Sequence, residues 1–201
     1  MKTFDIIIIG AGPSACSMAL ALHNSNLSVA MLEKSTFPRD KTCGDAIPYE
    51  AYQTLKSIDE KYYHQLYEIA DKSMIRFNRL ITPQGRDFTV EWTTKAFNCP
   101  RLVFDNQLFE WVKTDTQTTI FEKTVFKKAV YDDENNWIIE TNNGIFQAKF
   151  LVGAGGANCP VARRIANINL DRKHHSGAVR AYFKNINGLN ENTNEIYFLK
   201  E

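Results

Sequence analysis

A glycine-rich turn near the N-terminus constrains the fold more than any other feature of the sequence. The turn, GAGPSA, begins at Gly10 and directly follows four consecutive isoleucines at residues 6–9. Gly10, Gly12 and Ala15 match the GxGxx(G/A) pattern. In this pattern the first glycine permits a tight turn, the second lets the backbone approach a pyrophosphate, and the small third residue lets helix and strand pack closely. The stretch therefore predicts a buried parallel strand, a phosphate-binding turn and the start of a helix.

The residues that follow complete a strand–turn–helix–strand unit. Apolar side chains recur at helical spacing from Ala15 to Leu22, which predicts a helix whose small apolar face packs against the sheet. The segment VAMLE at residues 29–33 predicts a second buried strand. Glu33 ends this strand at the spacing expected of a carboxylate that accepts a hydrogen bond from a ribose hydroxyl. Such a carboxylate suits the ribose of FAD and of NAD equally, so the motif alone leaves both dinucleotides open.

Later segments predict further helices and a β-rich excursion. Asp105 stands where a side chain would cap a helix over VFDNQLFEWV. The stretch 118–152 contains a polar turn and the hairpin signal NNG, which indicate a three-stranded antiparallel excursion that returns to a final buried strand. The remaining expectations are a loop over 34–47, helices from Pro48 past Leu55 and over about 59–70, two strands around the Pro-Gln-Gly turn within 73–92, and strands near 178–183 and 195–199.

Charge and cysteine usage narrow the classes of function. The 24 Lys and Arg residues nearly balance the 23 Asp and Glu residues without forming a basic run, which argues against nucleic-acid binding and favours small-molecule chemistry. The four cysteines are widely spaced, form no CxxC pair and accompany no signal peptide or membrane-spanning run, so we expect reduced thiols in a cytoplasmic protein. His174 and His175 are adjacent but have no Cys or His close in sequence, so no metal site is predicted.

Three further elements make the chain resemble a known family. They are an Arg-x-x-x-Asp-x-x-Leu pattern at Arg101, Asp105 and Leu108, the late stretch GAGGANCPVARR at residues 153–164, and the loop FPRDKTCGDAIPYEA at residues 37–51. Together with the first turn they resemble the flavoprotein monooxygenase-like fold that binds FAD, and the Cys-Gly-Asp loop is similar to that of the geranylgeranyl reductase family. Two residues depart from the late glycine motif of the fold, because Gly155 stands at its aspartate position and Cys159 at its serine position.

The resemblance implies a role for each matching residue. The first glycine turn would hold the FAD pyrophosphate, Glu33 the adenosine ribose, and the loop around Cys43 would lie beside the isoalloxazine ring. Cys43 and Asp45 are the implied catalytic residues; the alternative interpretation of Cys43 is a small polar residue that merely fills the loop. The full set implied to bind FAD is Gly10, Gly12, Pro13, Ser14, Ala15, Glu33, Lys34, Lys41, Cys43, Gly44, Arg101, Gly155 and Gly156.

The resemblance also implies a domain organisation. The fold class is α/β: residues 1–175 would form a Rossmann-like FAD-binding domain with a parallel sheet and an antiparallel β excursion at about 118–150. Residues 176–201 would begin a second, β-rich substrate-binding domain that is truncated in this chain.

The implied function is that of an FAD-dependent oxidoreductase. It would reduce carbon–carbon double bonds of a geranylgeranyl or other polyprenyl substrate by hydride transfer from reduced flavin, with NAD(P)H or another external reductant as electron donor. Two alternatives stay open: an FAD-dependent monooxygenase or halogenase on the same scaffold, and a nucleotide-binding fragment without turnover. An isoprenoid lipid substrate implies peripheral contact of a cytoplasmic protein with a membrane, and the sequence leaves the oligomeric state open.

Overall fold

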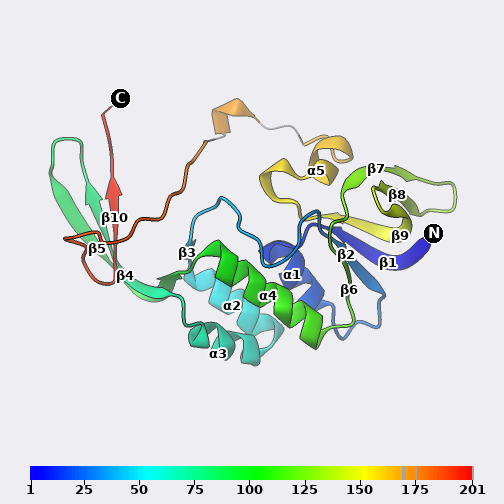
Figure 1. Ribbon diagram of the computed structural model, residues 1–201, viewed down its shortest axis with the longest axis horizontal. Coiled ribbons are helices and arrows are strands. Elements are labelled where there is room, and N and C mark those ends of the chain that lie inside the picture. Colours follow the sequence, from blue (N-terminus) through cyan, green and yellow to red (C-terminus); the bar gives the residue numbers. More distant parts are fainter. Residues whose placement is uncertain (169–170, 175, 201) are drawn as a thin grey trace. The chain divides into compact units, whose positions relative to one another are not determined.

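Two separate sheets organise the chain, one in each of two units (Figure 1). The computed structural model describes residues 1–168, 171–174 and 176–200. The first unit consists of Met1–Asp40 and Phe104–Gly177, and the second of Lys41–Val103 and Ala178–Glu201. Each unit is thus assembled from two stretches that are far apart in sequence. The sequence-based domain boundary between residues 175 and 176 stays a prediction.

The first unit is built on a six-stranded sheet in the order β6-β2-β1-β9-β8-β7. Strands β6, β2, β1 and β9 run parallel, and β8 and β7 continue the sheet in antiparallel pairing. This confirms the predicted α/β class with an antiparallel excursion. The strands are β1 (Lys2–Ile9), β2 (Val29–Leu32), β6 (Thr119–Phe121), β7 (Phe126–Tyr131), β8 (Trp137–Thr141) and β9 (Gly144–Gly153).

Burial explains why the isoleucine run lies at the centre of this sheet. Ile7 and Ile8 are fully buried, and Ile7 pairs with Ala30 of β2 on one side and Leu151 of β9 on the other. A strand flanked and covered in this way must be apolar on both faces. The first half of β9 pairs with β8, and most of the length of β9 pairs with β1. The third strand of the predicted excursion and the predicted final strand are therefore one continuous strand.

Helices and turns connect these strands. Helix α1 (Pro13–Ala21) follows the first glycine turn as predicted, with Ala15, Cys16, Ala19 and Leu20 buried. The prediction that Asp105 caps a helix is wrong, because α4 (Arg101–Asp115) begins four residues earlier, directly after Pro100, and holds Asp105 fully buried in its interior. The remaining elements of this unit are α5 (Pro160–Arg164) and the 3-10 turns η1 (Gly156–Asn158) and η2 (Arg172–His174).

The second unit combines a four-stranded sheet in the order β10-β4-β5-β3 with two helices. Its elements are β3 (Ala46–Ile47), α2 (Tyr49–Ile58), α3 (Glu60–Glu68), β4 (Ser73–Ile81), β5 (Asp87–Asn98) and β10 (Thr193–Tyr197). Tyr52 of α2 is fully buried, and its ring packs edge-on against Phe97 of β5 with ring centroids 5.2 Å apart. This contact anchors α2 on the sheet.

Two sequence expectations in the second unit need correction. The loop expected over 34–47 contains the short strand β3, because Ala46 and Ile47 pair with the end of β5 at Asn98 and Phe97. The segment 178–183, which lies within the described residues, forms no strand. Its polar side chains bind a loop instead, as described below, so its alternating pattern does not reflect pairing in a sheet.

Candidate functional site

Two glycine-rich turns meet at the ends of β1 and β9. The N–H of Ala154 donates to the carbonyl of Ile9 at 2.9 Å, and the N–H of Gly10 donates to the carbonyl of Leu32 at 2.8 Å. Gly10 has φ +110°, and a Cβ built on it would lie 2.6 Å from the carbonyl oxygen of Ala154. Only glycine fits here, because its positive φ permits the tight turn that the GxGxxA pattern assigns to the first glycine and its missing Cβ permits the close approach to Ala154.

The second glycine opens a space at the start of α1. Gly12 is the N-cap of α1, no side chain caps the helix there, and the first turn carries no acidic residue. A Cβ on Gly12 would have the Nη2 atom of Arg39 as its nearest neighbour, at 3.7 Å. First-turn N–H groups without intrahelical partners, together with the helix dipole, favour an anion at this position. The turn of Gly12, Pro13, Ser14 and Ala15 therefore fits the pyrophosphate of a dinucleotide.

Glu33 holds this turn in place from the end of β2. Its carboxylate is buried, and it accepts one hydrogen bond from the N–H of Ala11 and another from the N–H of Ser35, each at 2.9 Å. A carboxylate offers about four acceptor positions, so a ribose hydroxyl can still donate to it. The neighbouring Lys34 is exposed.

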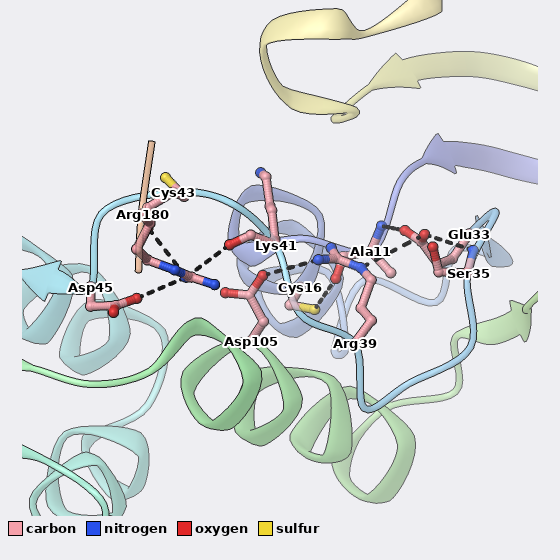
Figure 2. A network of polar contacts seen from close by, with 10 residues as sticks. All are labelled: Ala11, Cys16, Glu33, Ser35, Arg39, Lys41, Cys43, Asp45, Asp105 and Arg180. Carbon is pink, nitrogen blue, oxygen red and sulfur yellow. Dashed lines mark hydrogen bonds and ion pairs between the residues drawn. The ribbon is translucent and has the colours of Figure 1, made fainter. Parts of the chain in front are cut away.

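Arg39 is a candidate binding residue that the sequence analysis missed. Its Nε lies 3.8 Å from Glu33 Oε1 and its Nη1 lies 3.5 Å from Asp105 Oδ2, so the guanidinium is held between two buried carboxylates (Figure 2). The stacking of Phe37 on Phe109 of α4, with ring centroids 4.0 Å apart, fixes the loop that carries Arg39. A guanidinium beside Gly12 adds positive charge where a pyrophosphate would lie. The sequence signal that could have identified Arg39 is its position two residues before Lys41, in the loop already expected to bind the cofactor.

Gly155 and Cys159, the two residues that depart from the late glycine motif, pack against one another. A Cβ on Gly155 would lie 3.1 Å from the Cα of Cys159 and 3.4 Å from its sulfur, and Cys159 is itself buried. The absent side chain at Gly155 thus leaves room for Cys159. Arg163 and Arg164, at the end of the motif, are exposed and bind Asn158 Oδ1 and the carbonyl of Lys127, respectively.

The predicted Cys-Gly-Asp loop lies in the second unit and is held by Arg180. The Nη1 atom of Arg180 donates to the carbonyls of Lys41 and Cys43 at 3.0 and 3.4 Å and contacts Asp45 Oδ1 at 3.1 Å (Figure 2). The hydroxyl of Tyr182 donates to Asp45 Oδ2 at 2.8 Å. The loop is therefore positioned by residues more than 130 positions away in sequence.

The predicted site residues thus fall into two groups. The first unit brings together the two glycine turns, which include Gly156 at the start of η1, and Glu33. The second unit holds Lys41, Cys43, Gly44 and Asp45, and Arg101 is buried at the start of α4. The roles assigned to these residues stay predictions.

The four cysteines differ in reactivity. Cys43 is exposed, whereas Cys16, Cys99 and Cys159 are buried. Burial, reinforced by the charge of Asp105, raises the pKa of the Cys16 thiol to about 12, which keeps it protonated at neutral pH.

Thiol labelling of the native chain is expected to modify a single cysteine, Cys43, because the other three thiols are shielded from the reagent. Titration with Ellman's reagent should show one rapidly reacting thiol before unfolding and four after it. In the Cys43→Ala control the rapid reaction should disappear. Rapid reaction of two or more thiols in the native chain would contradict the burial described here.

Among the described residues, no group of three or more His, Cys, Asp and Glu side chains has the arrangement of a metal site, and His175 lies outside those residues. No helix in the described part of the chain has both the length and the apolar character needed to cross a bilayer.

Comparison with known proteins finds a matching family model and related proteins. A family model described as Glucose inhibited division protein A matches residues 5–196. Conditioned medium factor receptor 1 of Dictyostelium discoideum is 26% identical over 204 residues, covering 90% of this chain and 38% of that protein. A menaquinone reductase of Mycolicibacterium smegmatis is 32% identical over 186 residues, covering 89% of this chain and 44% of that protein. The chain thus spans about two fifths of the length of these relatives.

The fold is shared with a solved structure. A probable FAD-dependent monooxygenase from Pseudomonas aeruginosa superposes with a TM-score of 0.70 at 14% identity, over 85% of this chain and 47% of that one. The likeness confirms the predicted flavoprotein monooxygenase-like fold.

Proposed function

The chain belongs to the Glucose inhibited division protein A family, and from this membership we propose that it forms the FAD-binding part of a flavin-dependent oxidoreductase. The observation that carries the proposal is the uncapped start of α1, where Gly12, Arg39 and the first-turn N–H groups surround a position suited to a pyrophosphate. FAD is favoured over NAD because the solved structure with the same fold belongs to a probable FAD-dependent enzyme.

The proposed reaction is the reduction of a carbon–carbon double bond in a polyprenyl chain, such as a geranylgeranyl group. Two observations support it: the Cys-Gly-Asp loop resembles that of geranylgeranyl reductases, and a relative with 32% identity is named a menaquinone reductase, for a compound that carries a polyprenyl chain. Bound FAD, once reduced, supplies the hydride. The residues of this chain hold the nucleotide at Gly12 and Glu33, and the Cys43 loop shapes the reaction space and excludes water.

A monooxygenase or halogenase activity is the alternative, because a solved structure with the same fold is a probable FAD-dependent monooxygenase. Function lies in the site and not in the fold, so oxygen consumption decides between the two. Consumption of NAD(P)H that depends on oxygen and rises with an aromatic substrate would replace the reductase proposal. A nucleotide-binding fragment without turnover would retain FAD weakly or not at all, and it would reduce no alkene with any reductant.

The purified chain is expected to show a flavin absorption spectrum, or to acquire one with added FAD, and to release FAD on denaturation. If the Cys43 loop lies beside the flavin, bound FAD should also slow labelling of Cys43 by about tenfold, since access controls the reaction of an exposed thiol. AMP serves as the control ligand, because it fills the adenosine part of the site without covering the loop. A colourless protein that does not bind added FAD would refute the proposal.

A further inference from the structure

The second unit contains a pocket to which none of the roles above assigns a ligand, although Asp45 of the Cys43 loop lines it. Its volume is about 410 Å³, within the range of small-molecule sites, and it is widely open to solvent. It is lined by Asp45 and Tyr182, by residues 71–73 at the start of β4, and by residues 98–100 at the end of β5. All of these residues belong to the second unit.

The polar groups of the pocket are fixed before any ligand binds. The Asp45 carboxylate accepts a hydrogen bond from the Arg180 guanidinium at 3.1 Å and another from the Tyr182 hydroxyl at 2.8 Å. The N–H of Cys99, which is fully buried, donates to the carbonyl of Asp45 at 2.9 Å, and the Asn98 side-chain amide donates to Asn194 Oδ1 at 2.8 Å. A site with preformed geometry loses less entropy when it binds a ligand.

The charges of the pocket disfavour an anionic ligand. Asp45 and Asp71 place two carboxylates in its walls, and among the described lining residues Lys72 is the cation. The Nζ of Lys72 donates to the carbonyls of Tyr67 and Ile69 at the end of α3, and Arg180 is bound to Asp45 and to loop carbonyls. Both positive charges are therefore already engaged with oxygen atoms of the chain. A diphosphate would meet carboxylates without a cation directed toward it.

We propose that this pocket binds the head group of the prenylated substrate, and that this head group is neutral and carries carbonyl or hydroxyl oxygens, as a quinone does. The inference rests on the proposed function, whose polyprenyl substrates include both neutral and diphosphate-bearing compounds. The hydroxyl of Ser73 and the amide of Asn98 can donate to carbonyl oxygens, and the carboxylates of Asp45 and Asp71 can accept from hydroxyls. Pro100 and the Tyr182 ring supply flat apolar surface for a ring to pack on.

The test compares two probes on the 201-residue chain by ligand-observed NMR and calorimetry. Duroquinone is the neutral probe, and its full methylation prevents addition of thiols such as that of Cys43. Geranyl diphosphate is the anionic probe. We expect duroquinone to bind more tightly than geranyl diphosphate. Asp71→Lys should reverse this order by adding a positive charge to the wall.

Matched tyrosine variants identify the place of binding. Tyr182→Phe should weaken duroquinone binding about three- to tenfold, because it removes the hydroxyl that orients Asp45. Tyr197→Phe is the control, since the Tyr197 hydroxyl makes a similar bond, to Glu195 Oε2 at 2.7 Å, outside the pocket. Both tyrosines are more than half exposed, so both variants should fold, which circular dichroism can verify.

The outcomes separate this inference from the proposed function. Tighter binding of geranyl diphosphate than duroquinone by the unmodified chain, or equal weakening by the two tyrosine variants, would overturn the inference. A chain that binds FAD but not duroquinone would overturn it while leaving the proposed function intact. Duroquinone binding that is sensitive to Tyr182→Phe in a chain that does not bind FAD would support the pocket and refute the proposed function.

Discussion

Replacing Gly10 by alanine is expected to destabilise the chain by about 3 to 5 kcal/mol, whereas the same replacement at Gly12 should leave the fold intact and remove FAD binding. At Gly10 the new Cβ would lie 2.6 Å from the Ala154 carbonyl oxygen, and the residue has φ +110°. The obstructing oxygen belongs to the backbone of Ala154, whose N–H donates a hydrogen bond to the carbonyl of Ile9. The oxygen therefore cannot move aside without breaking this hydrogen bond to β1.

Gly12 differs because its φ is −76° and its Cβ would find its nearest neighbour at 3.7 Å. The alanine methyl would therefore occupy the space proposed for the pyrophosphate while straining nothing in the chain. Each charge-assisted hydrogen bond lost to the phosphate should lower FAD affinity by about ten- to a hundredfold. Urea unfolding and a titration with FAD measure the two effects separately.

Gly85→Ala provides the control for backbone strain alone. Gly85 also has positive φ, at +80°, but a Cβ there meets no atom within 4 Å. We expect it to cost about 1 kcal/mol, from the left-handed conformation without a clash. If Gly10→Ala destabilised the chain no more than Gly85→Ala does, the close approach of the two glycine turns would be wrong. Full FAD affinity in Gly12→Ala would place the pyrophosphate elsewhere.

Sequence patterns correctly predicted the strands and turns whose residue types are dictated by their immediate surroundings. Residues 6–9 are apolar because a central parallel strand is buried on both faces, and the turn after them needs glycine at Gly10, so both features are visible in sequence. Strand β6 was missed because Thr119–Phe121 is too short to show a period, and only its pairing with β2 makes it a strand. The segment 178–183 has an alternating pattern but forms no strand in the described structure.

The candidate site was predicted less completely because its charges are paired over long sequence distances. Arg39 lies 66 positions from Asp105, and Arg180 lies 135 positions from Asp45. Neither pairing has a local signature, so Arg39 could not be distinguished from a solvated loop arginine, nor Arg180 from a strand residue. Asp105 was read as a helix cap because its residue type suits that position, although Pro100 sets the start of the helix.

Asp105→Asn is expected to destabilise the chain by about 3 kcal/mol, because it leaves Arg39 without the charge of its buried partner. Asp105 is fully buried, and the Arg39 side chain is 14% exposed. We expect a loss of stability at the lower end of the range for broken buried ion pairs. The Arg39–Asp105 separation is long, at 3.5 Å, and Arg39 keeps its contact with Glu33 at 3.8 Å. Urea unfolding at neutral pH measures the loss.

A double variant separates the two roles of Arg39, which are to neutralise Asp105 and, as proposed, to bind the pyrophosphate. Arg39→Met with Asp105→Leu replaces both charges by apolar side chains and should be less destabilised than the sum of the single changes, by about 1 to 3 kcal/mol. Stability should thus recover in part in this variant, but FAD affinity should not, because the guanidinium beside Gly12 is gone. Additive destabilisation would show that the ion pair is not coupled. Recovery of FAD affinity along with stability would show that Arg39 supports the fold alone and leaves phosphate binding to the N–H groups of α1.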